Sequence, residues 1–105
     1  MAKPTTYTFV VRHEGLSSLS QTPCSQSQTI IDAHPLTLLI VGHTHTYSHY
    51  ASDKEVVVGN GGAPLSTSVN YGYVIGYRAA GGVLRFEAHD YATRAVFDSF
   101  SVNPD

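Results

Sequence analysis

The sequence predicts an α+β domain dominated by β-structure, a partial sandwich in which two parallel N-terminal strands joined by a short helix precede antiparallel strands. Residues 36–41 are almost continuously apolar, which indicates a strand buried on both faces. Later segments alternate in character between glycine-rich or polar turns, as half-buried antiparallel strands do. The 105 residues, 42% of them hydrophobic, are sufficient for one domain covering 1–105.

The first part of the chain predicts a strand, a loop and a helix. Residues 6–12 are rich in Tyr, Thr, Phe and Val and predict the first strand. Residues 16–28 are rich in Ser and Gln, which predicts a surface loop that holds the single cysteine, Cys24. Residues 27–34 predict a short helix, capped by its first serine and ended by Pro35.

The buried strand at 36–41 follows that helix, and a connection through a helix favours parallel pairing with the first strand. Residues 44–53 predict a polar loop, 55–58 a short strand and 59–62 a turn. The rest of the chain predicts three antiparallel strands, at residues 70–77, 83–89 and 95–102.

Composition argues against several classes of partner. A formal net charge of −2 supplies no basic surface for nucleic acid, so we expect no nucleic-acid partner. No apolar run approaches the roughly 18 residues of a membrane span, and we expect no membrane partner. The first residues contain no apolar signal-peptide core, and localisation stays open. A single cysteine excludes an internal disulfide.

Histidines follow both predicted parallel strands. His43 and His45 come directly after the buried strand and Gly42, and His13 follows the first strand. Neighbouring parallel strands end at the same edge of a sheet, so these imidazoles are expected to gather at one place. Neutral imidazole is the commonest side-chain metal ligand, which makes the three histidines candidate ligands.

Two motifs carry a family resemblance. The Gly-His-Thr-His sequence at 42–45, with Tyr47 after it and the Gly- and Pro-containing segment 59–64 downstream, resembles the last motif of the calcineurin-like metallophosphoesterases. It is closest to their purple-acid-phosphatase-like members. The Arg-His-Glu sequence at 12–14 resembles an earlier strand-end motif, in the family's order. The resemblance implies that residues 1–105 correspond to the C-terminal half of an αββα sandwich.

The family's site holds two metal ions that activate a water for phosphoester hydrolysis. The resemblance implies that His13 and His43 bind one ion and that His45 binds the other. Residues next to these ligands are expected to orient them or to line the rim of a substrate site: Arg12, Glu14, Tyr47 and His49. His34 and His89 are interpreted as structural.

The departure from the family is large. No Asp-x-His lies before the first strand, where the complete pattern starts, and the Gly-Asp-x-x-Asp and Gly-Asn-His motifs do not occur, so the bridging carboxylate and the catalytic acid are missing. We therefore assign no catalytic residue. Because a metal site usually has three or four ligands, the sequence predicts weak binding of one Zn²⁺, Fe or Mn²⁺ ion at His13 and His43, with His45 near enough to join.

Three interpretations follow. The first is a fragment or remnant of a metallophosphoesterase that has no activity alone. The second is a phosphoester hydrolase completed by a partner or an oligomer that supplies the carboxylates. The third is a structural or oligomerisation domain with relic histidines. Because residues 36–41 would form an exposed edge without neighbouring strands, we also expect a homo-oligomer or a separate N-terminal half.

Overall fold

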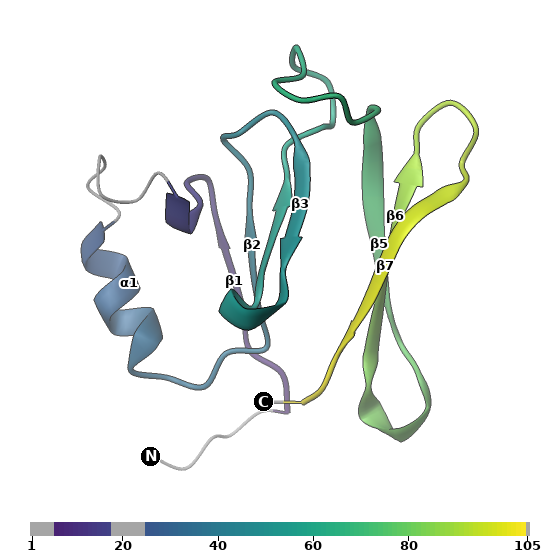
Figure 1. Ribbon diagram of the computed structural model, residues 1–105. Coiled ribbons are helices and arrows are strands. Elements are labelled where there is room, and N and C mark those ends of the chain that lie inside the picture. The colour runs from purple at the N-terminus through teal and green to yellow at the C-terminus, as the bar shows by residue number, and fades with distance from the viewer. Residues whose placement is uncertain (1–5, 18–24, 105) are drawn as a thin grey trace.

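The computed structural model describes residues 6–17 and 25–104, which form two stacked β-sheets and one α-helix (Figure 1). The four-stranded sheet has the order β1-β2-β4-β3 and the three-stranded sheet the order β5-β6-β7. Helix α1 lies beside the four-stranded sheet, on the side away from the three-stranded sheet (Figure 1). The layers are thus helix, sheet and sheet, and the predicted α+β class dominated by strands is confirmed.

The elements follow the predicted order closely. Their bounds are β1 (Phe9–Arg12), α1 (Ser25–Asp32), β2 (Leu38–Val41), β3 (Tyr47–Tyr50), β4 (Glu55–Val58), β5 (Gly72–Arg78), β6 (Leu84–Asp90) and β7 (Val96–Val102), with 3₁₀ turns at Ala51–Asp53 and Ala80–Gly82. Strands β1 and β2 pair in parallel, as predicted from the helix between them. Strands β5, β6 and β7 form an antiparallel meander, with a bulge where β6 and β7 pair near Ala88.

Strand β3 was not predicted, and the expectation of a loop over residues 44–53 is wrong. Tyr47 pairs with Val58 and Tyr50 with Glu55, so that β3 completes the sheet beside β4. The segment looks polar in sequence. Burial of the Tyr47 ring between the sheets nevertheless favours a strand there, and tertiary packing overrides local composition.

Helix α1 begins before the position expected from its sequence and ends at Asp32. Ser27 lies inside the helix and does not cap it; its hydroxyl instead accepts a hydrogen bond from Nη1 of Arg12 at 3.2 Å. Beyond the helix end, Nδ1 of His34 lies 2.8 Å from the carbonyl oxygen of Ile30, which agrees with a structural role for this histidine. Cys24 and most of the predicted loop lie outside the described residues. In the described part of the chain, no helix is long and apolar enough to cross a membrane.

Strand β2 is the centre of the four-stranded sheet, and the expectation that it forms an exposed edge is wrong. It pairs with β1 on one side and with β4 on the other. Leu38, Leu39 and Val41 are accordingly buried. The edge strands of this sheet are β1 and β3, because β4 takes the place beside β2 that the sequence left without a neighbour.

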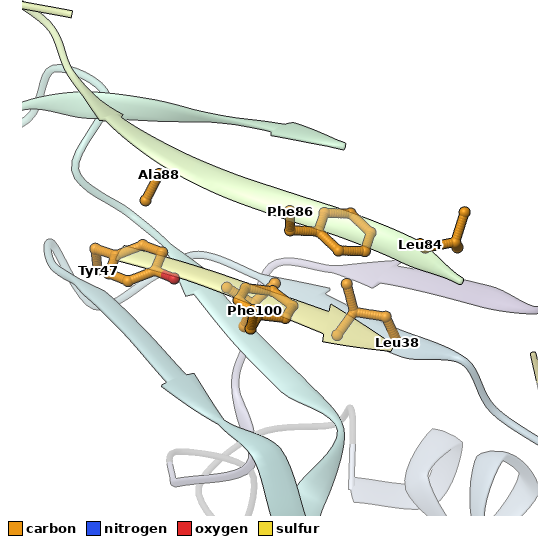
Figure 2. Packing of buried hydrophobic residues seen from close by; sticks show 7 residues of the cluster. Leu38, Tyr47, Leu84, Phe86, Ala88 and Phe100 are labelled. Carbon is orange, nitrogen blue, oxygen red and sulfur yellow. The ribbon is translucent and has the colours of Figure 1, made fainter. Parts of the chain in front are cut away.

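The two faces of β2 pack into different clusters, which explains its continuous apolar sequence. On one face Leu38 joins side chains from both sheets, several of which Figure 2 shows: Tyr47, Val56, Leu84, Phe86, Ala88 and Phe100. The rings of Phe86 and Phe100 stack with centroids 5.1 Å apart. On the other face Leu39 and Val41 pack with Val57 and with Val10 of β1.

The Leu38→Ala substitution should lower the free energy of unfolding by about 3 kcal/mol, because it removes a side chain that is 0% exposed and leaves a cavity between the sheets. Urea unfolding followed by circular dichroism measures this change. The matched control is Ile30→Ala on α1, where the side chain is 66% exposed and a change of less than about 0.5 kcal/mol is expected. Equal effects of the two substitutions would contradict this description of the core.

Candidate metal site

The side chains of His13 and His43 meet where β1 and β2 end. The ladder between the strands continues one step beyond them, because the backbone N–H of Gly42 donates to the carbonyl oxygen of His13 at 3.0 Å. Nε2 of His13 lies 3.1 Å from Nδ1 of His43, and the rings are nearly perpendicular. Both side chains are exposed. One of these nitrogens must donate a proton to the other, unless a cation accepts both lone pairs.

The backbone of His43 adopts a left-handed conformation, with φ of 64°. Histidine tolerates this region better than most residues other than glycine. The turn is closed by the N–H of Thr44, which donates to the carbonyl oxygen of Gly42 at 2.7 Å. The tight turn directly after β2 presents the His43 ring to His13.

Glu14 lies beside His43, whereas the sequence suggested that it would orient His13. Its Oε2 atom is 3.8 Å from Nε2 of His43, and this oxygen is buried without a hydrogen-bond partner among the described residues. A proton on Nε2 of His43 would face this carboxylate. The lone pair of Nδ1 would then point toward His13.

Arg12 braces the turn that carries the site. Its Nε donates to the carbonyl oxygen of Glu14 at 2.8 Å, and its Nη1 contacts Ser27 on α1. The guanidinium group, expected to orient a ligand or to line the rim of a substrate site, thus holds the end of β1 against the helix.

His45 is bonded to a different loop. Its Nδ1 lies 2.8 Å from the carbonyl oxygen of Pro64, which can only accept, so Nδ1 carries the proton and Nε2 has the free lone pair. The N–H and hydroxyl of Ser66 both donate to the His45 carbonyl oxygen. Gly59 permits this approach, since a Cβ there would lie 1.9 Å from the oxygen of Thr44.

The structure therefore brings together two of the three predicted metal ligands, His13 and His43. Within residues 6–17 and 25–104, no group of three or more His, Cys, Asp or Glu side chains is arranged to hold a metal ion. A depression of 490 Å³ at the start of β5 lies elsewhere and is lined by residues that include Asn70, Tyr71 and Asp90.

The Asp90 carboxylate at that depression accepts hydrogen bonds from residues of the adjacent turn and from Asn70. The backbone N–H of Thr93, the Asn70 side chain and the N–H of Ala92 all donate to its carboxylate, and these bonds lower the pKa of Asp90. His89 beside it contacts the Arg94 carbonyl oxygen at 2.9 Å, in agreement with a structural role.

Tyr47 and His49, expected at the rim of a substrate site, lie on β3 facing the other sheet. The Tyr47 hydroxyl donates to Asp98 at 2.7 Å; burial and this bond raise the pKa of Tyr47. The His49 ring stacks on Phe100 with centroids 3.6 Å apart. Burial lowers the pKa of His49, and the nearby charge of Asp98 partly opposes this shift. Both side chains thus contribute to packing between the sheets.

Glu55 is a positioning residue that sequence reasoning missed. It is 3% exposed, and its Oε2 accepts the backbone N–H of Leu16 at 2.8 Å. The same oxygen lies 3.3 Å from where a Cβ on Gly15 would be. The buried carboxylate therefore fixes the turn after His13 through its hydrogen bond with Leu16. The one sequence signal for this role was an acidic residue at the start of a short strand. Acidic residues are usually solvated, so this position did not indicate a buried carboxylate.

Comparisons with known proteins identify no relative. No protein-family model matches the chain, and neither a curated protein nor a solved structure matches it.

The stability of this protein should depend on the protonation of His49. Its pKa in the folded state lies below the ordinary 6.5, so the unfolded chain binds more protons as the pH falls through 6.5 and the folded state loses stability. Thermal unfolding at a series of pH values measures this loss. In the His49→Phe variant, which keeps an aromatic ring on Phe100, the decline toward acid should be smaller; an unchanged decline would contradict the assignment.

Proposed function

We propose that this chain is a metallophosphoesterase-like fragment or remnant that binds a single divalent metal ion through His13 and His43. It carries the histidine part of a dinuclear site and lacks the acidic part. On this proposal it has no phosphoesterase activity by itself. Zn²⁺, Fe and Mn²⁺ are the candidate ions, since each accepts imidazole ligands.

The observation that carries the proposal is the separation of the two ring nitrogens. They lie 3.1 Å apart, and both belong to exposed side chains at the ends of adjacent parallel strands. Two imidazole nitrogens on one tetrahedral Zn²⁺, each about 2.0–2.1 Å from the ion, are separated by about 3.3 Å. The pair thus needs little movement to share one ion.

The surroundings of the pair also support the proposal. Ligating histidines commonly present their second nitrogen to a carboxylate, and the buried, unpartnered Oε2 of Glu14 faces Nε2 of His43. A bond from Nδ1 to a backbone carbonyl similarly leaves Nε2 of His45 available. This arrangement fits a histidine that belongs to a second, incomplete ion position.

A bound ion at this pair would supply positive charge and lower the pKa of a coordinated water. The residues of this chain would contribute two ligands and one orienting carboxylate. In a complete site, other acidic residues would have to come from a partner or from a missing half. That requirement distinguishes the proposal from the alternative of an active hydrolase.

Zinc titration of the purified chain by calorimetry should show weak binding of one ion per chain. His13→Ala and His43→Ala should each abolish most of this binding, and Glu14→Gln should weaken it by roughly tenfold or more, because the carboxylate no longer orients His43. His34→Ala is the matched control, since that exposed histidine is bonded to Ile30 and should not affect binding.

Millimolar or undetectable binding, or equal loss in the His34 variant, would contradict the metal proposal. Hydrolysis of p-nitrophenyl phosphate with added Mn²⁺ or Zn²⁺ separates the inactive fragment from an active enzyme. We expect no turnover above that of the metal ion alone. Metal-dependent turnover that disappears in His43→Ala would favour the active alternative.

A further inference from the structure

The two sheets differ by one strand, and the difference leaves a step at one end of the sandwich. At the other end β3 faces β7: the Tyr47 ring contacts Phe97, and His49 stacks on Phe100. Strand β5 lies over the middle of the larger sheet, where its side chains and those of β2 and β4 line a common apolar gap. Among the described strands, none faces β1.

The inner face of β1 is exposed as a result. Phe9 pairs with Leu38 and Val11 with Ile40, so both side chains are on the face of the sheet that carries the core. Phe9 is nevertheless 45% exposed and Val11 76% exposed. The gap between the sheets, about 200 Å³ in volume and lined by Ile40 and Gly76 among others, adds to this unfilled space.

Strand β5 beside the step has an open edge. It pairs with β6 along its whole length and with no other described strand. Tyr73, Ile75 and Tyr77 form an exposed row on its outer face. An unprotected edge of seven residues with an apolar row is a surface that favours the addition of another strand.

We infer that a second copy of this chain docks at the step, with the β1 strand of each copy adding to the open edge of β5 in the other. The two copies are related by a two-fold axis that runs parallel to the strands, beside β1 and midway between the sheets. The axis places the larger sheet of one copy in the same layer as the smaller sheet of the other. It carries β1 of the larger sheet into the vacant place beside β5 of the other copy. Because the step is one strand wide, the operation leaves no gap and stacks the two β1 strands on each other.

Strand direction agrees with this docking. The hydroxyl of Tyr7, just before β1, donates to the carbonyl oxygen of Gly82, just after β5, so the two strands run in opposite directions. The axis preserves strand direction, and the new pairing of β1 with β5 is therefore antiparallel. Each of the two strands carries one charged side chain, Arg12 and Arg78, at its C-terminal end, and residues 6–11 and 72–77 are uncharged.

The available area indicates how tightly the copies associate. Phe9 and Val11, which stack on their symmetry copies, are 45% and 76% exposed, which corresponds to roughly 200 Å² per copy. Even with the backbone of the paired edges, this is below the roughly 600 Å² per partner of a standard specific interface, as in a weak, transient association. We therefore expect a dimer that dissociates in the micromolar range. The inference does not depend on metal binding.

Sedimentation equilibrium over a wide range of protein concentrations tests the docking. The mass of the wild-type chain should rise from 11.3 kDa toward twice that value. By symmetry, Val11 faces Val11 of the second copy across the axis. Val11→Lys and Val11→Glu should each remain monomeric, whereas an equal mixture of the two variants should recover the dimer because the charges then attract.

Tyr50→Lys is the matched control, since Tyr50 is 48% exposed on β3 at the far edge of the same sheet and should leave the dimer unchanged. Thermal unfolding at low concentration should show the same midpoint in the Val11 variants as in the wild type, because the side chain is exposed in the monomer. A monomeric wild type, a Val11→Lys variant that still dimerises, a mixture that stays monomeric, or loss of the dimer in Tyr50→Lys would each overturn the inference.

Discussion

The parallel pairing of β1 with β2 is the interaction on which the candidate site depends. Its register sets Arg12 beside Val41, and the next hydrogen bond, from Gly42 to His13, brings the two following histidines together. A slip of one residue would turn Val10 from its cluster with Leu39 and Val41 to the opposite face and separate the histidines. Burial of the apolar side chains on both faces of β2 therefore determines the geometry of polar groups that contribute nothing to the core.

Support for the site comes from side chains that lie outside it. Glu55, at the start of β4, holds the turn after β1 from within the protein, and Arg12 ties that turn to α1. The carboxyl ends of parallel strands are a common location for ligand sites, because loops diverge there while the strands remain rigid. Here His45 is bonded to Pro64, and among the described residues it forms no three-ligand group with the pair.

Strand β1 connects the proposed metal site with the inferred dimer. It ends at His13, and its inner side chains, Phe9 and Val11, form the exposed face of the step. As an edge strand it has a neighbour on one side only and is less constrained than β2 and β4 in the middle of the sheet. A second strand packed against it would restrict its motion, and the position of His13 with it. The hydrogen bonds between β1 and β2, together with the packing of the second copy on β1, would then hold His13 more firmly.

The sequence by itself determined most of the strands, the parallel pairing of the first two, the antiparallel pairing of the last three and the meeting of His13 with His43, because apolar periodicity and the helical connection are local signals. Only the tertiary structure decided the rest. Strand β3 forms because the Tyr47 ring is buried against the second sheet, and β4 pairs in parallel with the side of β2 that β1 leaves free. Glu14 faces His43 and not its neighbour His13, while the loop at Pro64 and Ser66 draws His45 away. Each of these outcomes depends on contacts between residues distant in the chain, and no local pattern encodes which of those contacts gains the most burial and hydrogen bonding.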